Sequence, residues 1–373
     1  MEAECQATDG HCRCPMEDAP RTARRREKTQ GALGMSSLQR RLDQEASTFP
    51  VQDDIWPGES GQGYVLRMCA QNGLGGVTRV KDMLGITRYQ TLDAQAASQL
   101  AHWFGAEVQH LSLALENKEH GRRVHGSSYM GHVLGRSYFL NRHYPRVCPD
   151  CLRDFGYCRA AWDFTLNVAC AFHRRLLVER CPACMSTLQW TRPGPDLCDC
   201  GHPWFQHDLP ATANGAELLI ARAIDQRMED GTQLASGMQF NREDDDDDLK
   251  MLRPLLEGMS LDGMFRLIFA LATAARYESV CSPQQRLRAA MPKARQTIAL
   301  GMKLGTKVAR LEPVLLTCRP SVLLDLLDDA APDSAPAIAD ISLAHSLLRT
   351  LISTKATSGW RSKHVSLAQL VLF

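Results

Sequence analysis

Four close pairs of cysteine and histidine residues lie between positions 148 and 200, and they constrain the fold of this chain more than any other feature. Two thiolates separated by two residues can both face one cation, and four such ligands complete a tetrahedral zinc shell. Eight ligands in four pairs therefore predict two zinc ions in this short region. The pairs are Cys148 with Cys151, Cys170 with His173, Cys181 with Cys184, and Cys198 with Cys200.

The order of the pairs allows two groupings. Sequential grouping assigns the first two pairs to one ion and the last two to the other, as in zinc ribbons. Cross-brace grouping joins the first pair to the third and the second to the fourth, as in RING domains. Seven residues separate His173 from Cys181, whereas the RING fold needs a very short connection there. We expect sequential sites, with His202 and His207 as surface histidines rather than ligands.

The ligand types predict a structural role for both zinc ions. A catalytic zinc keeps an open position and usually takes histidine or carboxylate ligands. Here each predicted shell is closed by protein atoms, mainly sulfur. The sequence also lacks a Gly-Lys-Ser/Thr phosphate loop, a Gly-x-Ser-x-Gly elbow and a His-Glu-x-x-His helix. We therefore expect a protein that is not an enzyme.

Clustered cysteines indicate a reducing compartment, in which thiols bind metal rather than form disulfides. The N-terminus lacks the apolar core of a secretory signal. The longest apolar stretch, residues 264–275, contains Arg266 and is typical of a buried helix rather than a membrane span. We expect a cytoplasmic protein with no membrane contact. Four scattered cysteines are predicted to be buried thiols: Cys69, Cys158, Cys281 and Cys318.

Composition and periodicity divide the chain into four parts: a disordered tail (1–48), an N-terminal helical domain (49–140), a tandem zinc-finger region (141–208) of loops and short strands, and a C-terminal helical domain (209–373) with an acidic linker at 241–248. The predicted class is mainly α with two small zinc-bound β/loop modules. The short N-terminal helices leave room for a helix-turn-helix. Helices are predicted over 59–72, 80–84, 94–104, 108–115, 216–229, 261–277, 284–304, 322–327, 341–351 and 366–373.

Charge is nearly balanced over the whole chain, at +1, but it is uneven along it. Residues 118–180 contain 11 Lys/Arg against 5 Asp/Glu, and an acidic run follows at 243–248. A basic module built around metal is typical of proteins that face nucleic acid, although a solvated positive surface has the same composition. The candidate contacts with phosphate or a protein partner are Arg142, Arg146, Arg174 and Arg175.

The zinc-region sequence closely resembles the TniQ family. The resemblance lies in residues 148–152, Tyr157, Trp162, 170–177 and 181–184, and it continues through 188–202. Residues 56–60, 66–67 and 72–74 are similar to the opening helix of that family, so the resemblance covers residues 57–204. Two features depart from the family pattern: the Gly61-Gln62-Gly63 sequence within the opening helix, and the C-terminal third, which matches no motif.

TniQ proteins are accessory target-selection factors encoded by bacterial transposons. The resemblance implies a non-catalytic protein that connects target DNA, or an RNA-guided complex, to the AAA+ ATPase and the transposase of the transposon. A homodimer is compatible with this role. Two other functions are left open by the residues themselves: a zinc-containing DNA-binding transcription regulator and, less favoured by the spacing, a RING-like ubiquitin-type ligase.

Overall fold

The structure is a computed structural model that describes residues 48–87, 89–118, 126–204, 210–229, 247–274, 290–309 and 340. All of these belong to one compact unit, Thr48–Phe373. Several predictions lie outside the described residues: the tail, most of the acidic linker, the helices over 322–327, 341–351 and 366–373, His207, Cys281 and Cys318.

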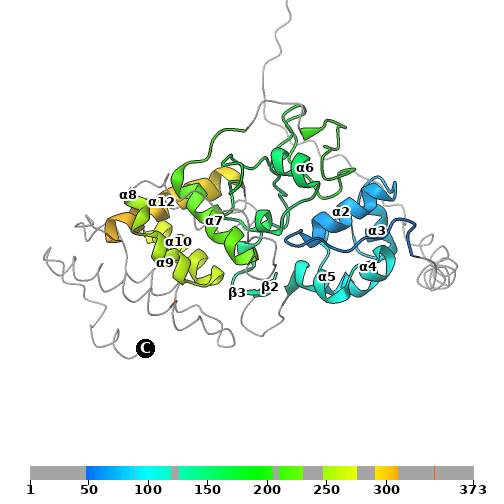
Figure 1. Ribbon diagram of the computed structural model, residues 1–373, viewed down its shortest axis with the longest axis horizontal. Helices are drawn as coiled ribbons and strands as arrows, with labels where there is room; N and C mark the ends of the chain where they lie inside the picture. The colour runs from blue at the N-terminus through cyan, green and yellow to red at the C-terminus, as the bar shows by residue number, and fades with distance from the viewer. Residues whose placement is uncertain are drawn as a thin grey trace, which may run out of the picture. The chain divides into compact units, whose positions relative to one another are not determined.

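The N-terminal helices form close to where the periodicity predicts them. They are α2 (Gly61–Gln71), α3 (Thr78–Met83), the 3-10 helix η1 (Ala94–Ala96), α4 (Ala97–Phe104) and α5 (Val108–Ala114), and Figure 1 shows α2 to α5 gathered together. Asn72 is the C-cap of α2 and Gly73 follows it at φ +67°, which confirms the predicted helix end. A helix-turn-helix among these helices stays a prediction.

Helix α2 begins at two glycines because its backbone lies close to other parts of the chain. A Cβ on Gly61 would lie 2.5 Å from the carbonyl oxygen of Ala114 at the end of α5. A Cβ on Gly63 would lie 2.7 Å from the Cβ of Cys158. The hydroxyl of Ser60 accepts a hydrogen bond from the amide of Gly63 and caps the helix. Close packing at these two positions offsets the low helix propensity of glycine.

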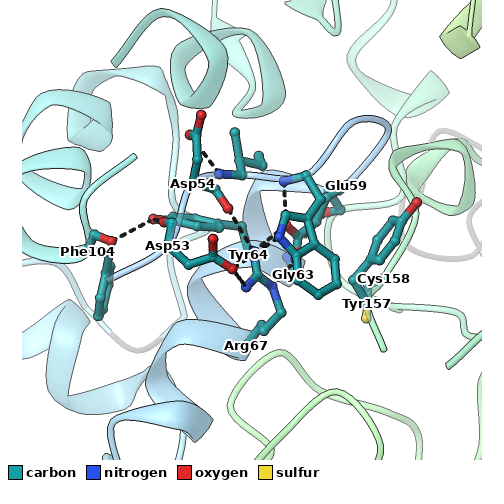
Figure 2. Close-up of polar contacts among 12 residues, drawn as sticks. Asp53, Asp54, Glu59, Gly63, Tyr64, Arg67, Phe104, Tyr157 and Cys158 are labelled. Atoms are coloured by element: carbon teal, nitrogen blue, oxygen red, sulfur yellow. Dashed lines mark hydrogen bonds and ion pairs between the residues drawn. The ribbon is translucent and has the colours of Figure 1, made fainter. Parts of the chain in front are cut away.

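A buried ion pair fixes the extended segment in front of α2. Arg67 points back from the helix and donates from Nε to Glu59 Oε1 (2.8 Å) and from Nη1 to Asp53 Oδ2 (2.7 Å), as Figure 2 shows. Its guanidinium also lies 4.1 Å from the ring centre of Trp56. The hydroxyl of Tyr64 donates to the carbonyl oxygen of Asp53 at 2.9 Å. These contacts hold the extended segment against α2, in the region that resembles the TniQ opening helix. The residues that make them are called the Arg67 clasp below: Asp53, Trp56, Glu59, Tyr64 and Arg67.

The described strands form one small antiparallel sheet, β1 (Asn117–Lys118), β2 (Ser127–Tyr129) and β3 (His132–Leu134), in the order β1-β2-β3. Tyr129 pairs with His132 across a turn that contains Gly131 at φ +77°. The sheet lies before the zinc region, not within it. The zinc region was expected to combine loops with short strands. Its described residues, 141–204, form loops, isolated β-bridges and short helices, and the strands expected there are absent from this range.

The C-terminal helices are α7 (Gly215–Glu229), α8 (Asp247–Lys250), α9 (Arg253–Gly258), α10 (Leu261–Ala274) and α12 (Met291–Ala309), which Figure 1 shows gathered together. They agree with the predicted helices over 216–229, 261–277 and 284–304 as far as those ranges are described. The last two residues of the predicted acidic linker belong to α8. Gly301 lets α12 approach α10 closely, because a Cβ there would lie 2.7 Å from the carbonyl oxygen of Ile268.

Aromatic side chains at positions 139 and 164 pack against α10 in one hydrophobic core. Phe139 stacks on Phe269 with ring centres 5.7 Å apart, and it meets Phe265 edge-on at 5.3 Å. Phe164 also meets Phe265 edge-on, at 5.7 Å. The domain boundaries at 140 and 208 stay predictions. No helix among the described residues combines the length and the apolar character needed to cross a membrane.

Candidate metal centres

The first two pairs of predicted ligands converge on one point. Cys148, Cys151 and Cys170 are buried, His173 is half-buried, and their four ligand atoms all lie within 4.8 Å of one another. His173 Nδ1 lies 3.5 Å from the sulfurs of Cys148 and Cys170 and 3.2 Å from that of Cys151. A tetrahedral zinc shell with ordinary bond lengths separates sulfur from nitrogen by about 3.6 Å. This set of residues, called the first cluster below, therefore has the size of a zinc shell.

The last two pairs form a second cluster, made of Cys181, Cys184, Cys198 and Cys200. The sulfurs of Cys181 and Cys200 are 3.8 Å apart, and those of Cys184 and Cys198 are 3.7 Å apart. Two sulfurs in a tetrahedral zinc shell are separated by about 3.8 Å, whereas a disulfide bond is about 2.0 Å long. Both clusters thus combine neighbouring pairs, as sequential grouping predicts, and neither has the interleaved pattern of a cross-brace.

One ligand pair in each cluster lies on a turn with the same backbone geometry. These are the pair Cys170 and His173 in the first cluster and the pair Cys181 and Cys184 in the second. In the first cluster the amide of Arg174 donates to the carbonyl oxygen of Cys170 at 2.9 Å. In the second the amide of Met185 donates to the carbonyl oxygen of Cys181 at 2.8 Å. Arg174 and Met185 are both left-handed, with φ +56° and +59°. Non-glycine residues rarely take this conformation, so its recurrence one position after each pair indicates backbone shaped around a ligand site.

The first pair lies at the start of a helix. Cys148 is the N-cap of α6 (Pro149–Phe155), and Cys151 lies inside it. Pro149 occupies the first helical position, where a missing N–H leaves no bond unmade. The helix also brings Asp154 to the cluster, three residues after Cys151 and hence on the same face. The carboxylate of Asp154 lies 3.0 Å from Nε2 of His173, the ring nitrogen that does not face the cluster. It can therefore fix the orientation of the imidazole ring.

Several other predictions can be compared with these positions. Cys69 and Cys158 are buried free thiols, as expected. His202 lies outside both clusters, and its carbonyl oxygen accepts a hydrogen bond from the amide of Cys198. The support from Asp154 was missed, although its spacing from Cys151 on a helix is a signal that sequence reasoning could have used.

Arg146 is buried instead of facing a partner. Only 1% of the residue is exposed, and Nη1 donates to the carbonyl oxygens of Thr165 (2.9 Å) and Asn167 (2.6 Å). Burial lowers the pKa of Arg146 to about 10, and the nearby Glu179 carboxylate opposes that shift. A phosphate contact by this side chain is not compatible with its position. Through these hydrogen bonds Arg146 instead stabilises the segment between the first two ligand pairs.

The other three candidate arginines occupy different environments. Arg142 is half-buried and forms an ion pair with Glu116. Arg174 is exposed at the left-handed position described above. Arg175 is half-buried and donates to the carbonyl oxygen of Pro210 at 3.0 Å. Of these four candidates only Arg174 is exposed, so they do not form one basic surface beside the first cluster.

A second polar group that sequence reasoning missed lies beside the N-cap of α2. The carboxylate of Asp163 accepts hydrogen bonds from the hydroxyls of Ser60 (2.6 Å) and Tyr129 (2.5 Å). Loss of solvent around this carboxylate raises the pKa of Asp163 to about 6, against the two hydrogen bonds, which lower it. The group joins α2, β2 and η3 (Ala160–Asp163), which are far apart in the sequence.

Comparison with known proteins supports the resemblance seen in the sequence. The family model described as TniQ matches residues 50–177. This part of the chain is similar to the TniQ family. The match covers about a third of the chain, and it contains the Arg67 clasp and all four residues of the first cluster. No curated protein matches the chain.

The second cluster lies after the matched residues, as do α7 to α12. One pair in each cluster lies on the same kind of turn, so the backbone geometry seen in the matched region recurs just after it.

Proposed function

We propose that this protein is a non-catalytic accessory factor of DNA transposition, which links recognition of a target site to the AAA+ ATPase and the transposase of a bacterial transposon. The observation that carries the proposal is the TniQ match over residues 50–177 together with the first cluster that it contains. The protein would act in the bacterial cytoplasm, either on target DNA itself or through an RNA-guided complex, as a monomer or a homodimer.

Each cluster would hold one structural zinc ion. The first would bind through Cys148, Cys151, Cys170 and His173, and the second through Cys181, Cys184, Cys198 and Cys200. Seven sulfurs and one imidazole favour zinc over magnesium or calcium, which take oxygen ligands. Four protein ligands at each point leave no position for substrate, which supports a role in folding. Bound zinc would contribute on the order of 10–16 kcal/mol of apparent binding free energy.

The geometry favours this function over the ligase alternative, because the ligand pairs are grouped sequentially and not interleaved. A transcription regulator would share the zinc modules but would bind one operator without an ATPase. The discriminating property is therefore the partner, not the metal.

The test combines metal analysis of the purified full-length chain with capture of the AAA+ ATPase encoded beside it. We expect two zinc ions per chain and retention of the ATPase on the immobilised protein. Variants that replace a cluster cysteine with serine should lose zinc. Cys158→Ser is their matched control, because Cys158 is buried but lies outside both clusters. Two zinc ions without ATPase capture, combined with tight binding to one duplex sequence, would instead establish the regulator.

A further inference from the structure

The two cysteine clusters differ in how far solvent reaches their sulfurs. Cys184 and Cys200 of the second cluster are exposed, whereas Cys181 and Cys198 of the same cluster are buried. All three cysteines of the first cluster are buried. Oxidation of a cysteine depends on access of the oxidant as well as on thiolate character. Among the seven cysteines of the two clusters, the two exposed ones are therefore open to a small oxidant in solution.

Each exposed sulfur of the second cluster has a buried sulfur close to it. Sγ of Cys184 lies 3.7 Å from Sγ of Cys198, and Sγ of Cys200 lies 3.8 Å from Sγ of Cys181. A disulfide bond is about 2.0 Å long, so a shift of less than about 2 Å joins either pair. One accessible thiol beside a second thiol is the arrangement typical of cysteines that are oxidised reversibly.

The segment between Cys184 and Cys198 packs on the N-terminal helices. A Cβ on Gly76, at the start of α3, would lie 2.6 Å from the carbonyl oxygen of Thr191 in this segment. The side chain of Arg192 is buried. The segment is thus held by the second cluster at its ends and by close packing in its middle. A bond between the two cysteines would draw those ends together while the middle stays in contact with α3.

We propose that Cys184 and Cys200 are sites of oxidation by hydrogen peroxide, and that each then forms a disulfide with its buried neighbour. The exposed thiolate attacks one oxygen of peroxide. The S–O bond of a sulfenic acid forms, the O–O bond breaks and hydroxide leaves. The buried thiolate then attacks this sulfur, so that the S–S bond forms, the S–O bond breaks and a second hydroxide leaves. Two thiolates thereby supply the two electrons that reduce one peroxide.

The second cluster should lose its metal in this reaction. The thiolate is the form of cysteine that binds metal, and one disulfide removes two of the four ligands. Loss of zinc rests on the proposed function, because that function places zinc in the cluster. Formation of the disulfides does not, since it depends only on the exposure and separation of the sulfurs.

The test treats the zinc-loaded full-length protein with hydrogen peroxide. Metal analysis after gel filtration measures the zinc that stays bound, and mass spectrometry of peptides maps the disulfides. We expect the loss of one of two zinc ions per chain, bonds from Cys184 to Cys198 or from Cys181 to Cys200, and reduced thiols in the first cluster. A dithiol reductant with added zinc should restore the zinc content, because a disulfide is reversible and a sulfinic acid is not.

A double variant, Cys184→His with Cys200→His, separates oxidation from loss of a ligand. Histidine binds zinc but forms no disulfide, so this variant should keep both zinc ions per chain before and after peroxide. Cys69→Ser is the control, because Cys69 is a buried thiol outside both clusters, and it should lose one zinc ion as the parent chain does. If the double variant binds no zinc at the second cluster, the disulfide map of the parent chain still decides.

Three results would overturn the proposal. They are oxidation of the first-cluster cysteines as fast as those of the second, reduced Cys184 and Cys200 after peroxide treatment, and sulfinic acid at these positions without either disulfide. A second cluster without zinc in the untreated protein would contradict the proposed function instead, and the disulfide map would still test the oxidation sites. The two failures are therefore distinguishable.

Discussion

Nε2 of His173 lies 3.0 Å from Oδ2 of Asp154, while Nδ1 of the same ring faces three cysteine sulfurs. A histidine that ligates a metal through one nitrogen commonly donates the other N–H to a carboxylate, which fixes the tautomer and the orientation of the ring. The contact also joins the two pairs of the first cluster, because Asp154 follows Cys151 on α6 and His173 belongs to the next pair.

Asp154→Asn should therefore weaken metal binding at the first cluster by about 10- to 100-fold. The amide keeps the size of the side chain but removes the charge that makes the imidazole a better ligand. Competition with a chromophoric chelator measures the effect. Asp82→Asn, at an exposed position on α3, is the control and should leave the affinity unchanged. Equal affinities for both variants would show that Asp154 does not support the ligand.

The two clusters should lose zinc separately and at different rates. Cys184 and Cys200 are exposed, whereas all three cysteines of the first cluster are buried. A chelator should therefore remove about half the zinc in a fast phase, from the second cluster. Cys184→Ser should abolish the fast phase and keep one zinc, while Cys151→Ser should abolish the slow phase and lower the melting temperature further. A slow phase lost in Cys184→Ser would contradict the assignment.

Gly61→Ala should destabilise the protein although alanine is the better helix former. The new methyl group would lie 2.5 Å from the carbonyl oxygen of Ala114, and such overpacking costs about 1–3 kcal/mol. Urea denaturation measures the free energy of unfolding. At Gly194, the nearest heavy atom to a new Cβ would be 3.3 Å away, so Gly194→Ala should change stability by less than about 1 kcal/mol. A more stable Gly61→Ala variant would show that α2 and α5 can separate without cost.

Glu59→Gln should destabilise the clasp strongly, because it leaves the charge of Arg67 buried without its main partner. The side chains of Arg67 and Glu59 are 4% and 0% exposed. Removal of one member of such a pair typically costs about 3–5 kcal/mol. Asp53 is 39% exposed, so Asp53→Asn should cost no more than about 1 kcal/mol. Equal losses in the two variants, measured by denaturation, would mean that burial does not distinguish the partners.

Asp163 should make stability fall as pH rises through the range of its shifted pKa. The pKa is raised from 3.8 to about 6 in the folded chain, so between these values the folded state binds more protons than the unfolded state. The stabilising contribution is complete below pH 3.8 and is lost by about pH 6. From pH 5 to pH 7 the loss should be on the order of 1 kcal/mol. Asp163→Asn should remove this part of the pH dependence, and an unchanged profile would contradict it.

The two clusters of cysteine and histidine could be predicted from sequence because ligand identity and spacing alone restrict which residues can share an ion. The sequential grouping followed from one spacing in the sequence, the seven residues between His173 and Cys181. The helices were predictable for a similar reason, since apolar spacing reports which face is buried. Sequence reasoning failed where long-range packing decides the outcome. The glycines of α2 appeared unfavourable in the sequence, but they make room for Ala114 and Cys158.

Arginine roles were the least predictable part of the site. Arg146 and Arg174 have the same chemistry in the sequence, yet one is buried among carbonyl oxygens and the other is exposed. Only the folded path of the chain brings the oxygens of Thr165 and Asn167 to Arg146. The sheet was also missed, because strands of two or three residues are too short to show an alternating pattern.

Contacts between aromatic rings determine where this protein can be truncated. The rings belong to Phe139, Phe164, Phe265 and Phe269. A fragment cut where the family match stops, at residue 177, would lose the contacts of Phe139 and Phe164 with Phe265 and Phe269. The family match therefore ends before the hydrophobic core does. A truncated protein should retain α10, which carries Phe265 and Phe269.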